Sequence, residues 1–263
     1  MNNKNNDSHP DMTVRVMSYN IHSGIGMDGR YDADRIADVI RSAGADIVGL
    51  QEADVHWGER SRYDDTPRRL ADRLGMHLFF APIYTLAPED GKAHERQFGV
   101  ALLSKFPIVR AENRRLTRLS TQDAHAAPSP MPGFLEAVLD VKGTPLTVYV
   151  THLDFRSDPA IRSVQVDEML DMMARRDGLK LLIGDFNARP DAAELCPLFS
   201  AMRDTWTEVK RDPGFTFPAD APDRKIDYIL AGPGLCTVSS AIVDSDASDH
   251  RPIVAELRLK NGN

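Results

Sequence analysis

Short apolar runs that end in polar side chains are the feature of this sequence that most constrains its fold. The clearest example is "LLIGDFNARPD" at residues 181–191, where an apolar run leads directly into Gly, Asp and Asn. Runs rich in β-branched residues predict strands. They recur at residues 14–20, 46–52, 98–104, 134–141, 145–153, 179–186, 225–230 and 251–259. The segment "KGT" at residues 142–144 predicts a hairpin between two of them.

Helices are predicted between these strands. Asp32 caps a helix that ends at Gly44, while Thr66 with Pro67 and Asp158 with Pro159 open two more. Because hairpins join some strands and helical crossovers join others, the pattern predicts an α/β fold in which two mixed sheets pack together with helices outside, in four layers. The proline-rich residues 125–133 predict a surface loop, and the arginine-rich residues 110–118 have the spacing of a solvated helix or loop.

The length and composition favour one domain. The chain has 263 residues, 42% of them hydrophobic, so we expect a single domain over residues 12–260 after a flexible tail at residues 1–11. No run approaches the roughly 18 apolar residues that span a membrane, and the N-terminus lacks a signal-peptide pattern. A cytoplasmic protein, monomeric, is expected. Cys196 and Cys236 are too few for a disulfide framework and are expected to be buried free thiols.

Side chains able to do chemistry gather where the predicted strands end. Each alone has a structural explanation, such as a turn, a surface charge or a cap. Together they supply carboxylate, amide and imidazole groups without a cysteine cluster, which favours a hard cation, Mg²⁺ or Mn²⁺, over zinc. Such a set suits hydrolysis of a phosphate ester by an activated water. The residues are Asn20, Glu52, His152, Asp185, Asn187, Asp227, Asp249 and His250.

Seven segments in order also carry a resemblance: "MSYNIHSG", "DIVGLQEAD", "FGVALLSKFPI", "YVTHLD", "IGDFNARP", "KIDYIL" and "SDHRPIV". The chain resembles the endonuclease/exonuclease/phosphatase superfamily of magnesium-dependent phosphohydrolases, from about Met17 to Val254. The resemblance implies a DNase-I-like αββα sandwich with the active site at one edge. It also implies that Glu52 is the principal metal ligand, that Asn20 contacts or orients the metal and phosphate, and that Asp249 helps to hold the ion.

The same motifs imply roles for the remaining residues. Asp185 resembles the group that positions or deprotonates the attacking water, while Asn187 and His152 would donate to the developing phosphorane oxygens. His250 resembles the histidine that contacts the scissile phosphate, with Asp227 as its carboxylate orienter. A neighbouring carboxylate favours the charged form of an imidazole.

The substrate depends on the loops, because the superfamily includes nucleases, deadenylases, sphingomyelinases and inositol-phosphate phosphatases. Arg60 and Arg62, after Glu52, and Arg96 are candidates for binding a substrate phosphate, with a solvated charged loop as the alternative. Abasic-site endonucleases that resemble this chain carry a Trp- and Arg-rich segment before the "RIDY"-type motif. Here residues 212–225 hold two phenylalanines, three aspartates and no tryptophan.

This departure and the net charge of −7 disfavour a nucleic-acid partner. We therefore expect a metal-dependent hydrolase of a phosphodiester or phosphomonoester, in a small molecule or a lipid headgroup. A metal-dependent endonuclease or exonuclease acting on DNA or RNA is the first alternative. A non-catalytic binding protein that keeps the same fold is the second.

Overall fold

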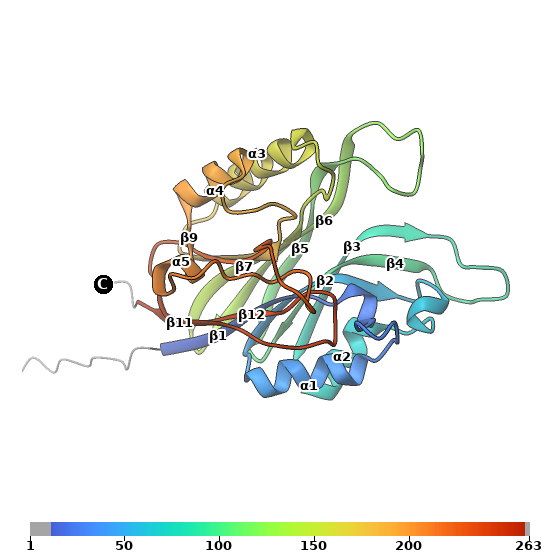
Figure 1. Ribbon diagram of the computed structural model, residues 1–263, viewed down its shortest axis with the longest axis horizontal. Helices are drawn as coiled ribbons and strands as arrows, with labels where there is room; N and C mark the ends of the chain where they lie inside the picture. The colour runs from blue at the N-terminus through green and yellow to red at the C-terminus, as the bar shows by residue number, and fades with distance from the viewer. Residues whose placement is uncertain (1–11, 261–263) are drawn as a thin grey trace, which may run out of the picture.

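Two β-sheets packed face to face form the centre of the molecule (Figure 1). The structure is a computed structural model that describes residues 12–260, so the tail predicted at residues 1–11 lies outside the described residues. The first sheet has the strand order β11-β12-β1-β2-β4-β3. Its strands are β1 (Met12–Asn20), β2 (Ile47–Val55), β3 (His77–Leu86), β4 (Arg96–Ser104), β11 (Leu235–Ile242) and β12 (Ile253–Leu259).

The second sheet has the strand order β5-β6-β7-β8-β10-β9. The predicted hairpin is confirmed, because β6 and β7 pair antiparallel from Leu135 with Val150 to Val141 with Thr144. The strands are β5 (Ile108–Arg118), β6 (Ser129–Val141), β7 (Thr144–His152), β8 (Leu179–Asp185), β9 (Arg203–Asp204) and β10 (Asp227–Ala231).

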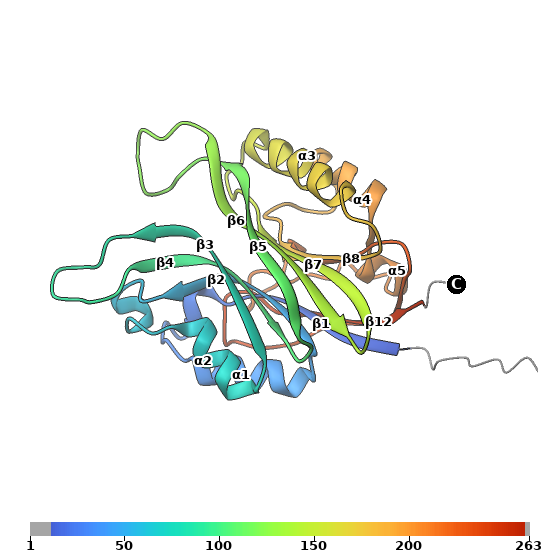
Figure 2. The same ribbon diagram turned by 180° about the vertical axis from the view of Figure 1, so that it is seen from behind.

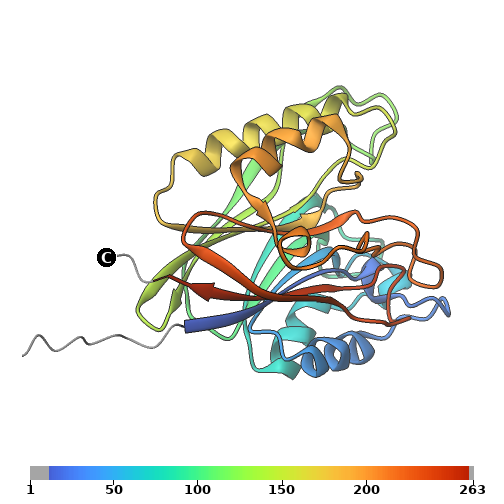
Figure 3. The same ribbon diagram turned by 60° about the vertical axis from the view of Figure 1, so that its left-hand side comes forward.

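Helices cover the outer faces of both sheets, which confirms the predicted four layers (Figures 2 and 3). On the first sheet lie α1 (Ala33–Ala43) and α2 (Thr66–Leu74), and on the second lie α3 (Ala160–Ala174) and α4 (Cys196–Ala201). The short α5 (Thr205–Val209) packs beside β10 and β11. Three short 3₁₀ turns complete the structure, at His22–Gly24, Glu59–Ser61 and Ala193–Leu195. Within the described residues, no helix is long and apolar enough to cross a membrane.

Helix ends follow the predicted signals with shifts of one residue at α2 and α3. The N-cap of α3 is Pro159 and not Asp158, so this helix begins at Ala160, one residue later than predicted. The Asp32 side chain accepts a hydrogen bond from the backbone N of Arg35, and Gly44 ends α1 in the left-handed conformation with φ 66°. The cap of α2 is Asp65, whose carboxylate accepts from the backbone N of Arg68, and Thr66 is already inside the helix. Aspartate is a preferred N-cap because its carboxylate accepts a hydrogen bond from a free N–H group of the first turn. With Asp65 as the cap, α2 begins at Thr66, one residue earlier than predicted.

Two segments predicted as loop or solvated surface are strands. Residues 110–118 lie in β5, which pairs with β6, and β6 includes residues 129–133 of the predicted loop. The arginines fit a strand because Glu136 of β6 is almost fully buried and accepts hydrogen bonds from Arg110, Arg114 and Arg176. The arginines of residues 110–118 form ion pairs with a neighbouring strand. Their spacing along the chain does not reveal such pairs.

The cysteine prediction was half right. Both thiols are free, but Cys196 at the start of α4 is exposed and Cys236 in β11 is half-buried. Because α4 has only six residues and covers the sheet with one face, its first residue points to solvent.

Two pairs of parallel strands position the site. β1 pairs with β2 through the α1 crossover, and β7 pairs with β8 through the α3 crossover. The carboxyl ends of parallel strands lie at the same edge of a sheet, and β1 packs against β8 of the other sheet. The polar residues that follow Leu50 and Ile183 therefore lie at one edge shared by the two sheets, which is here called the rim.

Glycine allows the two sheets to approach closely at Gly49 and allows the neighbouring strands β7 and β8 to do so at Gly184. A Cβ on Gly49 of β2 would lie 2.6 Å from Cγ2 of Ile183 in the opposite sheet, and one on Gly184 would lie 2.5 Å from the carbonyl oxygen of Thr151. Both positions therefore require the absence of a side chain.

We predict that Gly49→Ala lowers the free energy of unfolding by about 1 to 3 kcal/mol, the usual cost of overpacking a core. Denaturant unfolding followed by circular dichroism measures it. Gly58→Ala is the matched control, because the nearest atom to its Cβ is 3.9 Å away. Equal stability of the two variants would contradict the close packing described above.

Candidate active site

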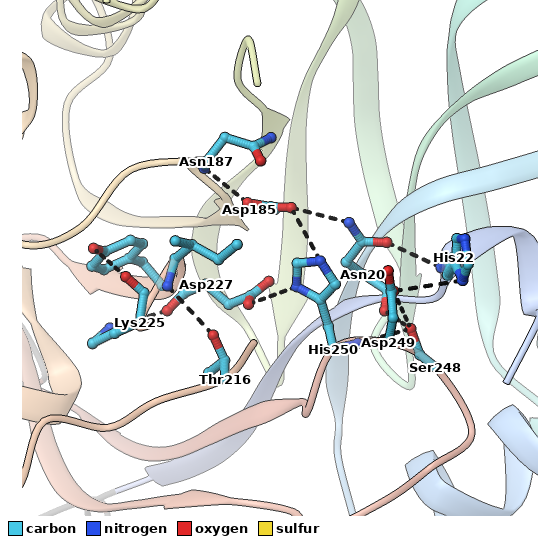
Figure 4. A network of polar contacts seen from close by, with 12 residues as sticks. Asn20, His22, Asp185, Asn187, Thr216, Lys225, Asp227, Ser248, Asp249 and His250 are labelled. Atoms are coloured by element: carbon cyan, nitrogen blue, oxygen red, sulfur yellow. Dashed lines mark hydrogen bonds and ion pairs between the residues drawn. The ribbon is translucent and has the colours of Figure 1, made fainter. Parts of the chain in front are cut away.

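The amide of Asn20 joins two carboxylates at the common rim of the sheets, and Figure 4 shows its contact with one of them, Asp185. Its Nδ2 donates to Oε1 of Glu52 at 3.0 Å and to Oδ2 of Asp185 at 3.0 Å. Its Oδ1 accepts from the backbone N of His22 at 3.0 Å. Asn20 is fully buried at the end of β1, so it holds a carboxylate of each sheet in a fixed position.

Glu52 is placed by an irregularity in β2. The pairing of β2 with β4 shifts register between Leu50 and Ala53, and Glu52 has a φ of 55°. A bulge with a left-handed residue turns a side chain away from the regular pleat. The Glu52 side chain therefore does not follow the regular up-and-down alternation of β2, and its carboxylate points into the rim.

The environment of Glu52 fits a divalent cation. Burial by itself raises the pKa of Glu52, but His152, the Asn20 amide and His250 lower it below the usual value, so the carboxylate is ionised. Among the described residues no Lys, Arg or His forms an ion pair with it. Glu52 and Asp249 line one cavity, which is described below. An ionised, partly buried carboxylate with an open oxygen is a suitable ligand for a hard cation.

Asp185 has the opposite shift. It is 1% exposed at the end of β8, and burial together with the charge of Asp227 raises the pKa of its carboxyl group. Its Oδ1 accepts from the backbone N of Asn187 at 2.8 Å, and its Oδ2 lies 3.5 Å from Nε2 of His152 and 3.8 Å from Nε2 of His250. A carboxylate with a raised pKa accepts a proton more readily at neutral pH.

His250 and Asp227 form a buried pair. Nδ1 of His250 lies 2.9 Å from Oδ2 of Asp227, and the Phe217 ring packs on the imidazole at a centroid distance of 4.7 Å. Burial lowers the pKa of His250, but the charges of Asp227, Asp185 and Asp249 raise it to about 10. The imidazolium form is therefore favoured, with Nε2 facing the rim as a donor.

Asn187 lies beyond the end of β8 in the left-handed conformation, with φ 51°. Its Nδ2 donates to the carbonyl oxygen of Leu153 at 3.0 Å, which fixes the amide beside Asp185. A non-glycine residue in this conformation is uncommon and is held by its surroundings.

Two cavities meet at the rim. A cavity of about 440 Å³, here called the catalytic cavity, is lined by Glu52, His152, Asp185, Asn187, Asp249 and His250 together with Phe155, Ala188, Arg189, Phe217, Arg224 and Ile226. A second cavity of about 260 Å³ shares Glu52, His152 and Phe155 with it. Six of the eight predicted catalytic and metal-binding residues thus line the catalytic cavity. The other two are buried behind this lining, where Asn20 bonds to Glu52 and Asp185 and Asp227 contacts His250.

Residues 17–250 match the Endonuclease/Exonuclease/phosphatase family. The chain belongs to this family. The resemblance seen in the motifs is therefore confirmed, and the family's members hydrolyse phosphoesters and typically use a divalent metal.

Solved structures of this family have the same fold. An endonuclease/exonuclease/phosphatase from Beutenbergia cavernae is 27% identical, with a TM-score of 0.79, covering 95% of this chain and 72% of that chain. The human Nocturnin catalytic domain, solved with a bound sulfate anion, is 21% identical with a TM-score of 0.70, covering 95% and 96%. A mannosyl-6-phosphatase from Bacteroides thetaiotaomicron is 18% identical with a TM-score of 0.69, covering 93% and 99%.

A curated relative is Protein cwh43 of Schizosaccharomyces pombe. It is 30% identical over 161 residues, which make up 59% of this chain and 14% of that protein. The chain therefore corresponds to a small part of that relative.

In this family member the arginines proposed for phosphate binding lie outside the catalytic cavity. Arg60 forms a bidentate pair with buried Asp54, at 2.9 and 2.7 Å, and lines the second cavity. Arg62 lies over the Tyr31 ring, and Arg96 donates to the carbonyl of Ala87 and pairs with Glu89. Their role at the phosphate stays a prediction without support from these contacts.

Several residues of the rim were missed by the sequence reasoning. Ser248 donates to the carbonyl of Asn20 at 2.7 Å, and Nδ1 of His22 lies 3.7 Å from Oδ1 of Asp249. Arg189 and Phe217 line the catalytic cavity. His22 and Ser248 lie within the segments "MSYNIHSG" and "SDASDH", which is a signal that could have identified them, whereas Phe217 carries no local signal.

A second donor group accompanies the Glu52 site. Ligand atoms of Asp185, Asp227 and His250 lie within 4.8 Å of one another. Because His250 is engaged by Asp227 and favours its protonated form, a cation there would have to displace a proton. Glu52 with Asp249 therefore fits a cation better than this group does.

We predict that Asp227→Asn lowers the pKa of His250 well below its value in the unchanged protein. The charge of Asp227 contributes most to the rise, while those of Asp185 and Asp249 remain. Proton NMR of the imidazole in metal-free protein, titrated with pH, measures it. Asp223→Asn, an exposed aspartate paired with Arg224, is the control, and a His250 pKa that stays high in Asp227→Asn would contradict the pairing.

Proposed function

We propose that this chain is a metal-dependent phosphohydrolase that cleaves a phosphoester of a small molecule or lipid headgroup by in-line attack of water. The observation that supports it most is the arrangement around Asn20, whose amide joins a carboxylate suited to a cation, Glu52, to a carboxylate with a raised pKa, Asp185. The charged imidazole of His250 lies beside them. Metal ligand, base and cationic donor are the groups that this reaction needs.

Mg²⁺ or Mn²⁺ is the proposed ion. Glu52 and Asp249 would hold it, and Asn20 would orient Glu52, since the Asn20 amide donates to carboxylates. When bound, such an ion supplies charge stabilisation to phosphate oxygens.

The chain's own groups carry the remaining steps. Asp185 holds the attacking water and accepts its proton. Hydrogen bonds from Asn20 and Asn187 fix the Asp185 carboxylate in position. His152 and His250 both face the Asp185 carboxylate and donate to the phosphate oxygens as charge develops. Loss of one such donor costs about 3 to 4 kcal/mol of transition-state stabilisation.

Small esters are favoured over nucleic acid by the distribution of charge. Arg69 pairs with Asp34, and Arg110 and Arg114 pair with Glu136. These arginines are neutralised by acids, so they do not form the free basic track that a duplex requires. A nuclease with the same machinery stays the alternative, and a binding protein is disfavoured because a scaffold does not need this set of groups together.

We predict that Glu52→Gln weakens Mn²⁺ binding by at least about tenfold, since even partners outside the ligand sphere contribute about 10- to 100-fold to affinity. Titration calorimetry measures the affinity, and Glu59→Gln, an exposed glutamate of the same loop, is the control. Equal affinity of the two variants would contradict the assignment of Glu52.

We predict that Asp185→Asn lowers kcat by about 10²- to 10⁴-fold, the usual contribution of a general base. Asp191→Asn, exposed in the same segment, should keep full activity. Phosphate or alcohol release from small phosphoesters with Mn²⁺ measures the rates, and EDTA should abolish them.

Nicking of supercoiled plasmid at low salt tests the nuclease alternative. The unchanged protein and Asp185→Asn are purified identically for this assay. Nicking that Asp185→Asn loses, and that falls steeply with salt, would favour the nuclease. No nicking, together with turnover of small esters, would favour the proposal.

A further inference from the structure

We propose that the second cavity binds the leaving alcohol of the substrate and selects an alcohol that carries a single ring. This inference rests on the proposed function. The cavity shares Glu52, His152 and Phe155 with the catalytic cavity, so a group attached to the reacting phosphate can extend into it. It is called here the aromatic cavity.

Three aromatic rings from separate strands form one wall of the aromatic cavity. Trp57 follows β2, Tyr84 lies in β3 and Phe98 in β4. The Trp57 and Phe98 centroids are 5.7 Å apart, and those of Tyr84 and Phe98 are 6.3 Å apart. All three are half-buried, so each keeps part of its ring available to a ligand. Flat ligand groups stack on such faces.

Polar contacts hold the aromatic wall in place. The Arg60 guanidinium lies 5.6 Å from the Trp57 and Phe98 centroids and is held by its bidentate pair with Asp54. The hydroxyl of Tyr84 accepts from the backbone N of Thr121 at 2.9 Å. A wall that is ordered before binding loses little entropy when a ligand enters.

Arg118 places a positive charge in the wall of the cavity. It is 7% exposed, and it donates to the carbonyls of Pro132, His152 and Gly133 at 3.2, 2.9 and 3.1 Å. No carboxylate forms an ion pair with it in the part of the chain that the structure describes. The charge has no direct ion pair, and the carboxylates of Asp154, which lines the same cavity, and of Glu168 act on it from a distance.

The size of the aromatic cavity limits the alcohol. Pockets for drug-sized ligands measure about 300 to 1,000 Å³, and this cavity measures about 260 Å³. One ring with small substituents fits this volume.

In-line geometry assigns the cavity to the leaving group. The attacking and leaving oxygens lie on opposite sides of the phosphorus, and Asp185, the proposed base, lines the catalytic cavity and not the aromatic one. The water oxygen bonds to phosphorus as the ester P–O bond breaks, with its electron pair on the alcohol oxygen. The water's proton passes to Asp185, and the alcohol oxygen takes a proton from solvent.

Benzyl and n-butyl phosphates, each as the monoester and as the methyl diester, provide the test, because the two alcohols differ in the ring and little in acidity. A hydrophobic pocket discriminates by about 10- to 200-fold per group that fills it. We expect kcat/KM at least about tenfold higher for the benzyl ester, and a ratio near one in Trp57→Ala and Phe98→Ala. Trp57→Phe, which keeps a ring, should retain most of the preference.

Tryptophan fluorescence gives a readout independent of turnover, because the chain has two tryptophans. Benzyl phosphate should change the emission saturably in Trp206→Phe and not in Trp57→Phe, since Trp206 lines neither cavity. Turnover without ring preference and without the Trp57 response would overturn the subsite and leave the hydrolase. A Trp57 response without turnover of any ester would overturn the hydrolase and support the cavity, and absence of both would overturn both proposals.

Discussion

The hydrogen bonds of one buried amide hold the rim of the sandwich together. Asn20 belongs to the first sheet, yet its Nδ2 reaches Glu52 of its own sheet and Asp185 of the other. Two ionised carboxylates that share one donor repel each other, and the N–H groups of the amide between them offset this repulsion. In the proposed function the positions of the attacking water, of the cation and of the substrate phosphate depend on this arrangement. Gly49 and Gly184 let the strands around it approach closely.

The surrounding groups shift the pKa values of the two carboxylates in opposite directions. Glu52 has a lowered pKa, and Asp185, which is more deeply buried and experiences the charge of Asp227, has a raised pKa. Two carboxylates with different environments can therefore act as metal ligand and as base in one site. The aromatic cavity adds a third kind of environment next to them, apolar on one side and cationic at Arg118.

Local patterns predicted most of the fold. The apolar runs identified β1, β2, β4, β6, β7, β8, β10 and β12 within a few residues, and caps such as Asp32 and Gly44 set the ends of α1. β3, β5, β11 and the two-residue β9 were missed. In β5 the arginines conceal the alternation, because their charges are paired with Glu136 of the neighbouring strand. A partner distant in sequence cannot be recognised from spacing.

The sequence by itself determined which side chains stand at the ends of strands, since the runs and their polar endings are local properties of the chain. It also determined the family, through motifs whose order survives without coordinates. Only the tertiary structure decided that Arg60 faces Asp54 and the aromatic rings while Arg62 and Arg96 face elsewhere, and that Trp57, Tyr84 and Phe98 form one wall. The reason is physical: the direction of a loop side chain and the shape of a cavity depend on contacts between segments far apart in the sequence.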